Sequence, residues 1–471
     1  MRFILFACLL LASLPSAALD RLQAEGYLLN NGLQLLLKPG NDRAHVAIRL
    51  VVGVGFADFG CADQELPHLL EHLLFSGLDD SGEGGLEERM QALGGEWNAF
   101  TSDTDTTFVI EAPARNQRKV LDLLLSAVTR TELTEARLDT ARRIVEREDG
   151  GHYSHLQRWL DHQDLGKDAS NQLAVELGLR CADRASAAGL TLAQVRQVRQ
   201  QWYAPNNMTL IVVGELDKLL PAYVERTFGE LAAVTPSDRS PPALERRSAE
   251  RERTLIQGWV GDAAKLHWYF LEPDVESLPP AVWDLLQVYF DWALYKKLRL
   301  EEGLSYGPGS QNEPFGDSTL LSLNADLDRD DIPQARQAVQ ALTSQLHRDG
   351  LDSATFERLK AGVIARQAWA IQGDSGLADY YWGALGDYED GHFADPAQAL
   401  REVTLAQANE AVRRLFADPG YVRVEKPLLG YDELATLITA ATVLAALLGL
   451  ALCIAIGRRR GRRATPMSGT K

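Results

Sequence analysis

Two kinds of hydrophobic periodicity follow each other along the first half of the chain, and together they predict strands interspersed with helices. Apolar runs at 27–29 and 33–37 flank Asn30-Asn31-Gly32, and Asn-Gly is the strongest two-residue signal for a β-hairpin. A mostly apolar stretch at 45–54 predicts a buried strand. The remaining predicted elements of this half are a strand at 106–111, helices over 116–130 and 135–149, a helix beginning at the capping box Thr191-x-x-Gln194, and a strand at 208–213.

A segment rich in proline and charge separates this series from a second one. Residues 231–254 contain three prolines among densely charged residues, which predicts a linker. After it come a predicted strand at 255–260, a long helix over about 280–299, strands ending near 327 and helices from 331 onward. The economical interpretation is an α+β fold with two similar-looking halves, 19–230 and 255–430, each a mainly antiparallel sheet with helices packed on it.

The two ends of the sequence predict targeting segments. Residues 1–18 combine one basic residue, an apolar run and small residues near the end, which is the pattern of a secretory signal peptide. Residues 434–456 carry no charge and are long enough to form a transmembrane helix, and five arginines follow within 457–471. Because positive charge stays on the cytoplasmic side, we expect a single-pass protein whose bulk is extracytoplasmic. In a bacterium this means the inner membrane, with the bulk in the periplasm and the basic tail in the cytoplasm.

The charge balance narrows the range of partners. The 471 residues have a formal net charge of −17, although the tail 457–471 has six basic residues and no acidic one. The body between the two ends is therefore strongly acidic and would repel phosphate backbones, which argues against a nucleic-acid partner. Cys61 and Cys181 lie in the part expected outside the cytoplasm, where they can form a disulfide or remain two buried thiols. The sequence favours neither arrangement.

The sharpest chemical motif is the segment Pro67-His68-Leu69-Leu70-Glu71-His72-Leu73-Leu74. Its leucines recur at helical spacing, and proline is tolerated in a first helical turn. On a helix His68 and His72 are four residues apart, so both imidazoles project from one face and can bind one metal ion. Glu71 is better placed to hold a water molecule at that ion than to bind the ion itself. The alternative is two histidines solvated on a helix face.

A third ligand is expected from the helix predicted over 135–149. Glu148 continues the stripe formed by the apolar residues Leu138, Ala141, Ile144 and Val145, whereas Glu146 lines up with charged residues on the opposite face. A carboxylate on the inner face is costly unless it is paired or binds a metal. Glu148 is therefore the predicted ligand, and an ion pair with an arginine is the alternative.

These motifs resemble the inverzincin family of zinc metallopeptidases, which includes pitrilysin, insulin-degrading enzyme and mitochondrial processing peptidase. The resemblance begins with H-L-L-E-H, followed by seventy-five residues and then a glutamate, Glu148. It continues over most of the ectodomain in four further segments, G-G-E-W-N-A-F-T at 94–101, D-T-T-F at 105–108, W-Y-A-P-N-N-M at 202–208 and L-R-x-x-x-G-L-S-Y at 298–306.

The resemblance implies a cofactor, Zn²⁺, with one ion per chain, and a set of site residues. The implied zinc ligands are His68, His72 and Glu148. Glu71 would be the general base. The implied substrate-binding residues, on an edge strand that pairs with an extended peptide, are Asn98, Ala99, Phe100 and Thr101. Two further residues would reach the active site from the second half, Arg299 and Tyr306, where the tyrosine would help to stabilise the oxyanion.

Two departures from the family pattern leave a second function open. Many active members carry a further glutamate seven residues before the third ligand, where this chain has Ala141, and its second half contains no H-x-x-E-H. The favoured function is a membrane-anchored zinc metalloendopeptidase that hydrolyses short or unfolded peptides. The alternative is a catalytically impaired binding or assembly subunit of the same fold that acts with an active partner. The expected protein partner is a second copy of the chain or an inactive homologue.

Overall fold

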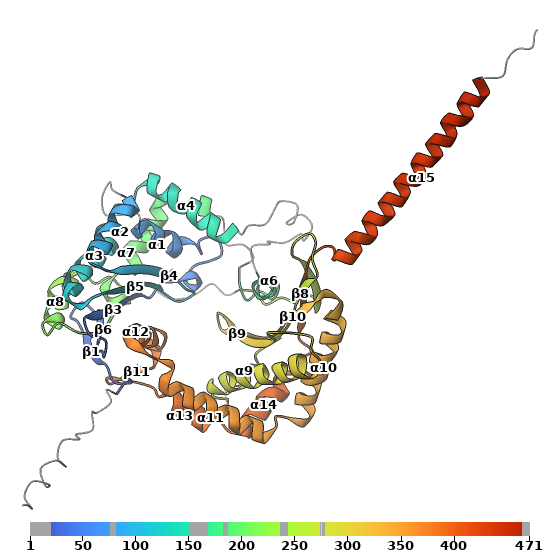
Figure 1. Ribbon diagram of the computed structural model, residues 1–471. Coiled ribbons are helices and arrows are strands. Elements are labelled where there is room, and N and C mark those ends of the chain that lie inside the picture. Colours follow the sequence, from blue (N-terminus) through green and yellow to red (C-terminus); the bar gives the residue numbers. More distant parts are fainter. Residues whose placement is uncertain are drawn as a thin grey trace, which may run out of the picture. The chain divides into compact units, whose positions relative to one another are not determined.

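The computed structural model describes residues 20–75, 82–150, 168–181, 187–235, 244–273, 275 and 278–463 (Figure 1). The chain divides into two compact units. The first unit contains Met1–Gly151, Gly178–Arg246 and Glu357–Val403, and the second contains His152–Leu177, Arg247–Phe356 and Thr404–Lys471. Each unit is built around one sheet.

The sheet of the first unit has six strands in the order β1-β2-β6-β3-β5-β4. Their bounds are β1 Glu25–Leu28, β2 Gln34–Pro39, β3 His45–Val52, β4 Glu96–Thr101, β5 Thr106–Pro113 and β6 Met208–Gly214. Only the β2–β6 pair is parallel. The predicted hairpin joins β1 to β2, with Gly32 at φ +88°, a conformation that glycine adopts without a Cβ penalty.

Helices cover both faces of this sheet. One face carries α1 (Leu66–Phe75), which contacts α4 (Glu135–Gly150), α7 (Leu192–Trp202) and α3 (Gln117–Arg130). Further helices of the unit are α2 (Gly82–Ala92) and α8 (Leu220–Thr227). The opposite face is covered by α12 (Gly373–Gly383), whose Leu377, Ala378 and Tyr381 pack against apolar side chains of β2, β3 and β6. Because both faces are covered, β3 is apolar and buried along nearly its whole length.

The sheet of the second unit has five strands in the order β7-β13-β8-β10-β9. The strands are β7 Glu252–Ile256, β8 Ala263–Leu271, β9 Gly309–Phe315, β10 Ser318–Asp328 and β13 Tyr421–Lys426. Here only the β7–β13 pair is parallel. The helices of this unit include α6 (Ala169–Glu176), α9 (Ala281–Leu294), which continues as a π-helix over Tyr295–Glu301, α10 (Ile332–Asp349) and α14 (Leu405–Leu415).

The predicted fold class is confirmed, because two mainly antiparallel sheets each carry packed helices. The units are nevertheless not the two continuous stretches 19–230 and 255–430. Residues 357–403 join the first unit because the apolar face of α12 packs on β3 and β6. Helix α6 joins the second unit, where Glu176 at its end pairs with the buried Arg423 of β13 at 2.7 Å.

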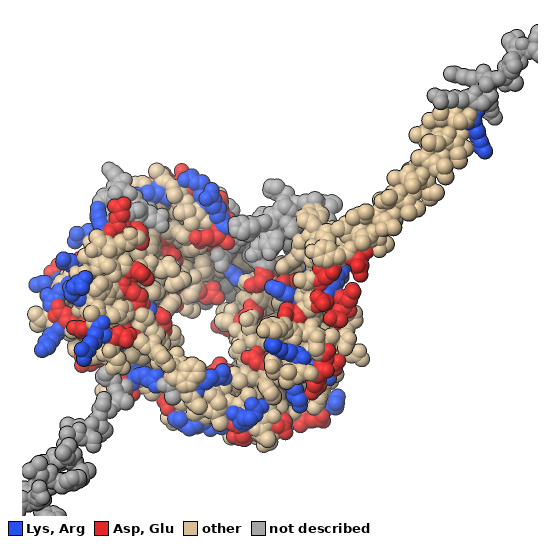
Figure 2. All heavy atoms as spheres, viewed as in Figure 1, with Lys and Arg blue, Asp and Glu red and all other residues tan. Residues whose placement is uncertain are grey.

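The C-terminal helix α15 spans Tyr431–Arg463. Its segment Tyr431–Arg459 is long and apolar enough to cross a membrane by length and composition, and it is not buried within the protein. Figure 2 shows this helix as a largely uncharged rod, with basic atoms near its far end. The predicted signal segment 1–18, residues 236–243 of the predicted linker and residues 464–471 lie outside the described residues.

Candidate metal centre

Helix α1 presents the two histidines of the H-L-L-E-H motif on one face. The leucines on its other side, Leu69, Leu70, Leu73 and Leu74, are fully buried in the core of the first unit. This packing fixes the rotation of the helix, so His68 and His72 both point toward α4. Their Nε2 atoms lie 3.1 Å apart.

Glu148, in the last turn of α4, completes a group of three ligand atoms. Its Oε2 lies 3.3 Å from Nε2 of His68 and 3.3 Å from Nε2 of His72. Ligands held at about 2.1 Å in a tetrahedral arrangement around zinc lie roughly 3.4 Å from one another. The three atoms therefore fit one zinc ion, and the two-imidazole, one-carboxylate donor set suits that metal.

The expectation that Glu148 lies on a buried face is wrong. Its side chain is 51% exposed, whereas Leu138, Ala141 and Val145 of the same helix are buried. The buried stripe ends at Val145 because the last turn of α4 extends beyond the core. Glu148 therefore meets the histidines at the open rim of the site, and Glu146 is exposed.

Glu65, just before α1, is a site residue that the sequence analysis missed. Its buried carboxylate lies 3.0 Å from Nδ1 of His68. An acceptor at Nδ1 holds the proton there and leaves Nε2 free to bind a metal. Burial lowers the pKa of His68, but the hydrogen bond to Glu65 and the charges of Glu71, Glu65 and Glu148 raise it, and the net shift is upward. A glutamate three residues before the first histidine was the signal that could have identified it.

Glu71 is buried on α1, and its carboxylate is held by Thr101 of β4. The Thr101 hydroxyl donates a hydrogen bond of 2.6 Å to Oε2 of Glu71. Thr101 was predicted to bind substrate through its strand, and the structure gives its side chain this additional contact. Nearby Tyr203 has its pKa raised by burial and, secondarily, by the charge of Glu71.

Strand β4 is the last strand of its sheet, and β5 is its partner on one side. Among the described residues, no strand pairs with its other side. Along β4, Asn98 and Phe100 are exposed and Ala99 is buried. Phe100 stacks on Trp382 of α12 with ring centroids 6.5 Å apart, which anchors the edge strand at the side of the sheet opposite α1.

Arg299 and Tyr306 lie in the second unit and contact each other. Nη1 of Arg299 donates a 2.7 Å hydrogen bond to the carbonyl oxygen of Tyr306, and its guanidinium lies 4.1 Å from the centre of the Tyr306 ring. The Tyr306 residue is 77% exposed. The arginine, on the π-helix, therefore orders an exposed tyrosine in the loop that follows this helix.

Two cysteines of the first unit form a disulfide. Cys61, just before α1, pairs with Cys181, and their Cα atoms lie 5.5 Å apart. Of the two arrangements left open by the sequence, the structure has the bonded one. The bond connects the approach to the histidine helix with the chain that follows α6.

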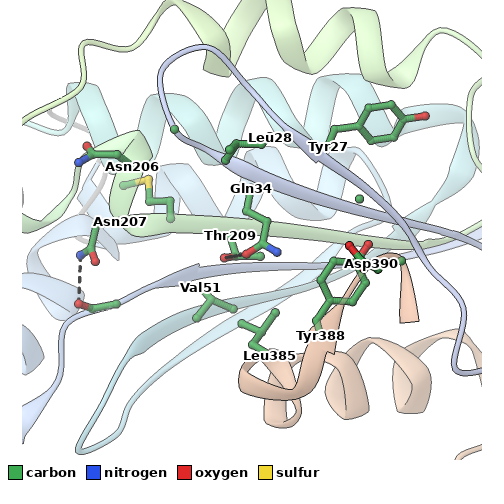
Figure 3. Close-up of a pocket in the computed structure, with 15 residues that line it drawn as sticks. Tyr27, Leu28, Gln34, Val51, Asn206, Asn207, Thr209, Leu385, Tyr388 and Asp390 are labelled. Atoms are coloured by element: carbon green, nitrogen blue, oxygen red, sulfur yellow. Dashed lines mark hydrogen bonds between the residues drawn. The ribbon is translucent and has the colours of Figure 1, made fainter. Parts of the chain in front are cut away.

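A pocket of about 620 Å³ in the first unit has different chemistry (Figure 3). Residues of β1, β2 and β6 line it together with Tyr388 and Asp390, and its lining contains no histidine or cysteine. At its rim the Asn207 amide donates to the carbonyl oxygens of Gly53 and Trp202, at 3.0 and 2.9 Å. The asparagine of the W-Y-A-P-N-N-M segment thus has a structural contact here, away from the metal-binding group.

Comparison with known families confirms the resemblance. Residues 37–182 match the family model described as "Insulinase (Peptidase family M16)", and residues 189–363 match the one described as "Peptidase M16 inactive domain". The chain belongs to the M16 family of zinc metallopeptidases.

Curated relatives and solved structures agree with this assignment. The chain is 22% identical to "Uncharacterized zinc protease YmxG" of Bacillus subtilis over 348 residues, 71% of this chain and 81% of that protein. It is 27% identical to "Probable zinc protease PqqL" of Escherichia coli over 367 residues, 71% of this chain but 37% of that protein. Its fold is that of a putative M16-like peptidase from Alicyclobacillus acidocaldarius, with a TM-score of 0.68, 18% identity, and coverage of 86% of this chain and 98% of that one.

Proposed function

We propose that this protein is a membrane-anchored zinc metalloendopeptidase that hydrolyses short or unfolded peptides on the extracytoplasmic side of a bacterial inner membrane. The observation that carries the proposal is the convergence of His68, His72 and Glu148 on one point, at mutual distances of 3.1 and 3.3 Å. Glu71, on the same helix as the histidines, supplies a carboxylate beside them. Relatives named zinc proteases support the same chemistry.

Several residues of this chain would each have a separate role in peptide hydrolysis. A bound zinc ion supplies Lewis-acid polarisation of the scissile carbonyl and acidifies water. Glu71 would accept a proton from the attacking water and return it to the leaving amine. Because Thr101 occupies Oε2 of Glu71, the proton would be carried at Oε1. Glu65 would keep the Nδ1 proton of His68 in place, so that Nε2 stays available as a ligand.

The substrate side of the proposal rests on β4. An extended peptide can add to the free edge of this strand by main-chain hydrogen bonds, with Asn98, Ala99 and Phe100 beside it. Most segments of a folded protein are already held in their own helices and sheets and cannot extend along β4, so the proposed substrates are short or unfolded peptides. Arg299 and Tyr306 are proposed to act on the same substrate, the tyrosine by donating to the developing oxyanion.

The proposed location rests on α15 and on the disulfide. The apolar segment Tyr431–Arg459 is followed by arginines, the arrangement expected when the following tail is cytoplasmic. The bond between Cys61 and Cys181 fits an oxidising compartment such as the periplasm. The signal segment 1–18 completes the proposed topology.

One observation favours a second candidate, a catalytically impaired binding or assembly subunit. Ala141 is buried in the core of the first unit at the position where many active members carry a supporting glutamate. Its methyl group offers no acceptor to the site. In this candidate the chain would bind peptides at β4 and act beside an active partner, either a homologue or a second copy.

Cleavage of a mixed peptide library by the full chain in detergent separates the two candidates. The wild type is compared with Glu71→Gln, which keeps the shape and both histidines but removes the base, and with Glu146→Gln as the matched control on the exposed side of α4. The peptidase proposal expects cleavage by the wild type and the control but not by Glu71→Gln. Zinc bound by a protein that cleaves no peptide would support the binding subunit, and equal cleavage by Glu71→Gln would contradict the mechanism.

A further inference from the structure

A second group of metal-ligand side chains lies in the first unit, away from the H-L-L-E-H helix. Asp42 lies in the segment that connects β2 to β3, His45 is the first residue of β3, and Asp374 lies in the first turn of α12. One ligand atom from each residue lies within 4.8 Å of those of the other two. The group therefore joins residues more than 300 positions apart in the sequence.

Asp374 is the unusual member of the group because it is a buried carboxylate with an unused oxygen. The residue is 2% exposed, and its Oδ2 accepts no hydrogen bond in the described structure. That oxygen lies 3.8 Å from Nδ1 of His45. Oδ1, in contrast, accepts the backbone N–H of Asn41 at 3.1 Å. A buried carboxylate oxygen without a partner is costly unless something binds it.

Two glycines make the space that this carboxylate occupies. A Cβ added to Gly40 would lie 2.0 Å from Oδ1 of Asp374, and a Cβ added to Gly214 would lie 3.2 Å from Oδ2. The carboxylate thus sits in a cradle that any larger residue at position 40 would fill. Asp42 is fixed on the other side, because its Oδ2 accepts the backbone N–H of Asp374 at 3.0 Å.

The second nitrogen of His45 is oriented by a further carboxylate. Nε2 of His45 lies 2.9 Å from Oε2 of Glu111, so a proton on Nε2 would leave the lone pair of Nδ1 directed toward Asp374. This carboxylate–histidine arrangement is the one that orients histidine ligands in metal sites. Glu111 is itself held by the buried Arg49, whose Nη2 lies 2.8 Å from Oε1.

The negative charges of Asp42 and Asp374 are not compensated by ion pairs with arginine or lysine in the described part of the chain. Arg49 is shared between Glu111 and Asp379, with Nε 2.7 Å from Oδ1 of Asp379. No arginine or lysine of the described ranges forms an ion pair with Asp42 or Asp374, and the basic group beside Asp374 is His45. A divalent cation would compensate these two negative charges and bind the unused oxygen.

We propose that Asp42, His45 and Asp374 form a second metal site, which binds a divalent transition-metal ion such as Zn²⁺ or Mn²⁺. Mixed imidazole and carboxylate donors suit these ions. The ion would tie the first turn of α12 to the entry of β3 and so fasten residues 357–403 to their sheet. A small rotation of the half-exposed His45 would close the group around the ion. The site does not depend on the proposed peptidase activity.

Metal stoichiometry of the full chain in detergent tests the proposal. After equilibration with Zn²⁺ or Mn²⁺ and removal of free ion, bound metal is measured by mass spectrometry. We expect two equivalents of Zn²⁺ for the wild type, one for His45→Ala and one for the double variant His68→Ala/His72→Ala. Adding His45→Ala to that double variant should remove the last equivalent. His392→Ala is the matched control, because the ring of this exposed histidine lies 3.2 Å from the Asp390 carbonyl oxygen in its own hairpin and away from both metal-ligand groups, and it should keep both equivalents.

A second measurement distinguishes loss of the metal site from misfolding of a variant. In the His68→Ala/His72→Ala background, Zn²⁺ should raise the melting temperature by several degrees, since it would bind the folded state alone, and Gly40→Ala should abolish that rise. The proposal is overturned if this background binds no ion, or if its affinity falls less than tenfold on adding His45→Ala. Ca²⁺ binding as tight as Zn²⁺ binding would also overturn it, because only an acidic cluster would then be present.

Discussion

The hydroxyl of Thr101 and the carboxylate of Glu71 are joined by a hydrogen bond of 2.6 Å. This contact ties the edge strand β4 to the helix that carries both histidines. A peptide that pairs with β4 would therefore lie against the strand that also holds the proposed base. Binding of the peptide and orientation of the base thus depend on the same strand.

Replacing Thr101 by valine removes this hydrogen bond while keeping the side-chain volume. A hydrogen bond to a charged group contributes about 1.5–3 kcal/mol, so we expect kcat to fall roughly 10- to 100-fold. KM and zinc content should change little, and Thr101→Ser should restore most of the rate. Steady-state kinetics on one cleaved peptide checks this, and a change confined to KM would show that Thr101 acts on the substrate alone.

Replacing Glu65 by glutamine tests the orientation of His68. The amide keeps the shape of the side chain but weakens the acceptor for the Nδ1 proton. Loss of such a partner costs metal sites roughly 10- to 100-fold in affinity, and we expect that loss for zinc. Competition with a chromophoric chelator measures it, with Glu146→Gln as the control. Unchanged affinity in Glu65→Gln would mean that His68 is oriented by its packing.

The sequence predicted the parts of the site that local periodicity determines. The spacing of leucines in α1 is enough to place His68, Glu71 and His72 relative to one another. The same periodicity, continued along α4, identified Glu148 but gave it the wrong environment, because periodicity does not show where a helix leaves the core. Glu65 and the Thr101 contact were missed for a related reason. Both depend on contacts between side chains of different segments, and the periodicity of one helix or strand does not predict such contacts.

The fold shows the same division between local and distant information. The β1–β2 hairpin, α3 and the capping box of α7 follow from neighbouring residues and are found close to their predicted positions. Strand β8, which has β13 and β10 as its neighbours in the second sheet, was not predicted. The packing of α12 on the first sheet was not predicted either. Both are set by contacts with other parts of the chain: Leu266 of β8 lies opposite Ala325 of β10 and Val424 of β13, and α12 packs on β3 and β6.

A carboxyl group in the second unit predicts how stability varies with pH. Burial, and secondarily the charge of Asp284, raises the pKa of Glu272 from its usual 4.5 to about 7. The folded state therefore holds this proton more tightly than the unfolded state does. The resulting stabilisation is complete below pH 4.5 and is lost as the pH rises through about 7.

Unfolding measurements between pH 4 and 8 check this on the wild type, Glu272→Gln and the exposed control Glu357→Gln. The free energy of unfolding of the wild type should fall across this range relative to that of Glu272→Gln, whose amide does not titrate. The control should follow the wild type. If all three proteins keep constant differences in stability, Glu272 ionises in the folded state as it does in the unfolded chain.

We expect a large loss of stability when the disulfide is reduced. Cys61 and Cys181 are 120 residues apart in the sequence, and closing a loop of this size restricts the unfolded chain by about 4–5 kcal/mol in the chain-entropy estimate. We expect Cys61→Ser/Cys181→Ser to lower the melting temperature of the full chain in detergent by roughly 10 °C. Because Cys61 lies just before α1, zinc should also dissociate at a lower temperature.

The same melting experiment with a reductant provides the control for this double variant. The reductant should bring the wild type to the melting temperature of the variant and leave the variant unchanged. This result would attribute the loss to the bond and not to the serines. Equal melting temperatures for the oxidised wild type and the variant would mean that the bond adds no net stability, because it restrains the folded chain as much as the unfolded one. The proposed oxidising compartment would then lose one of its supports.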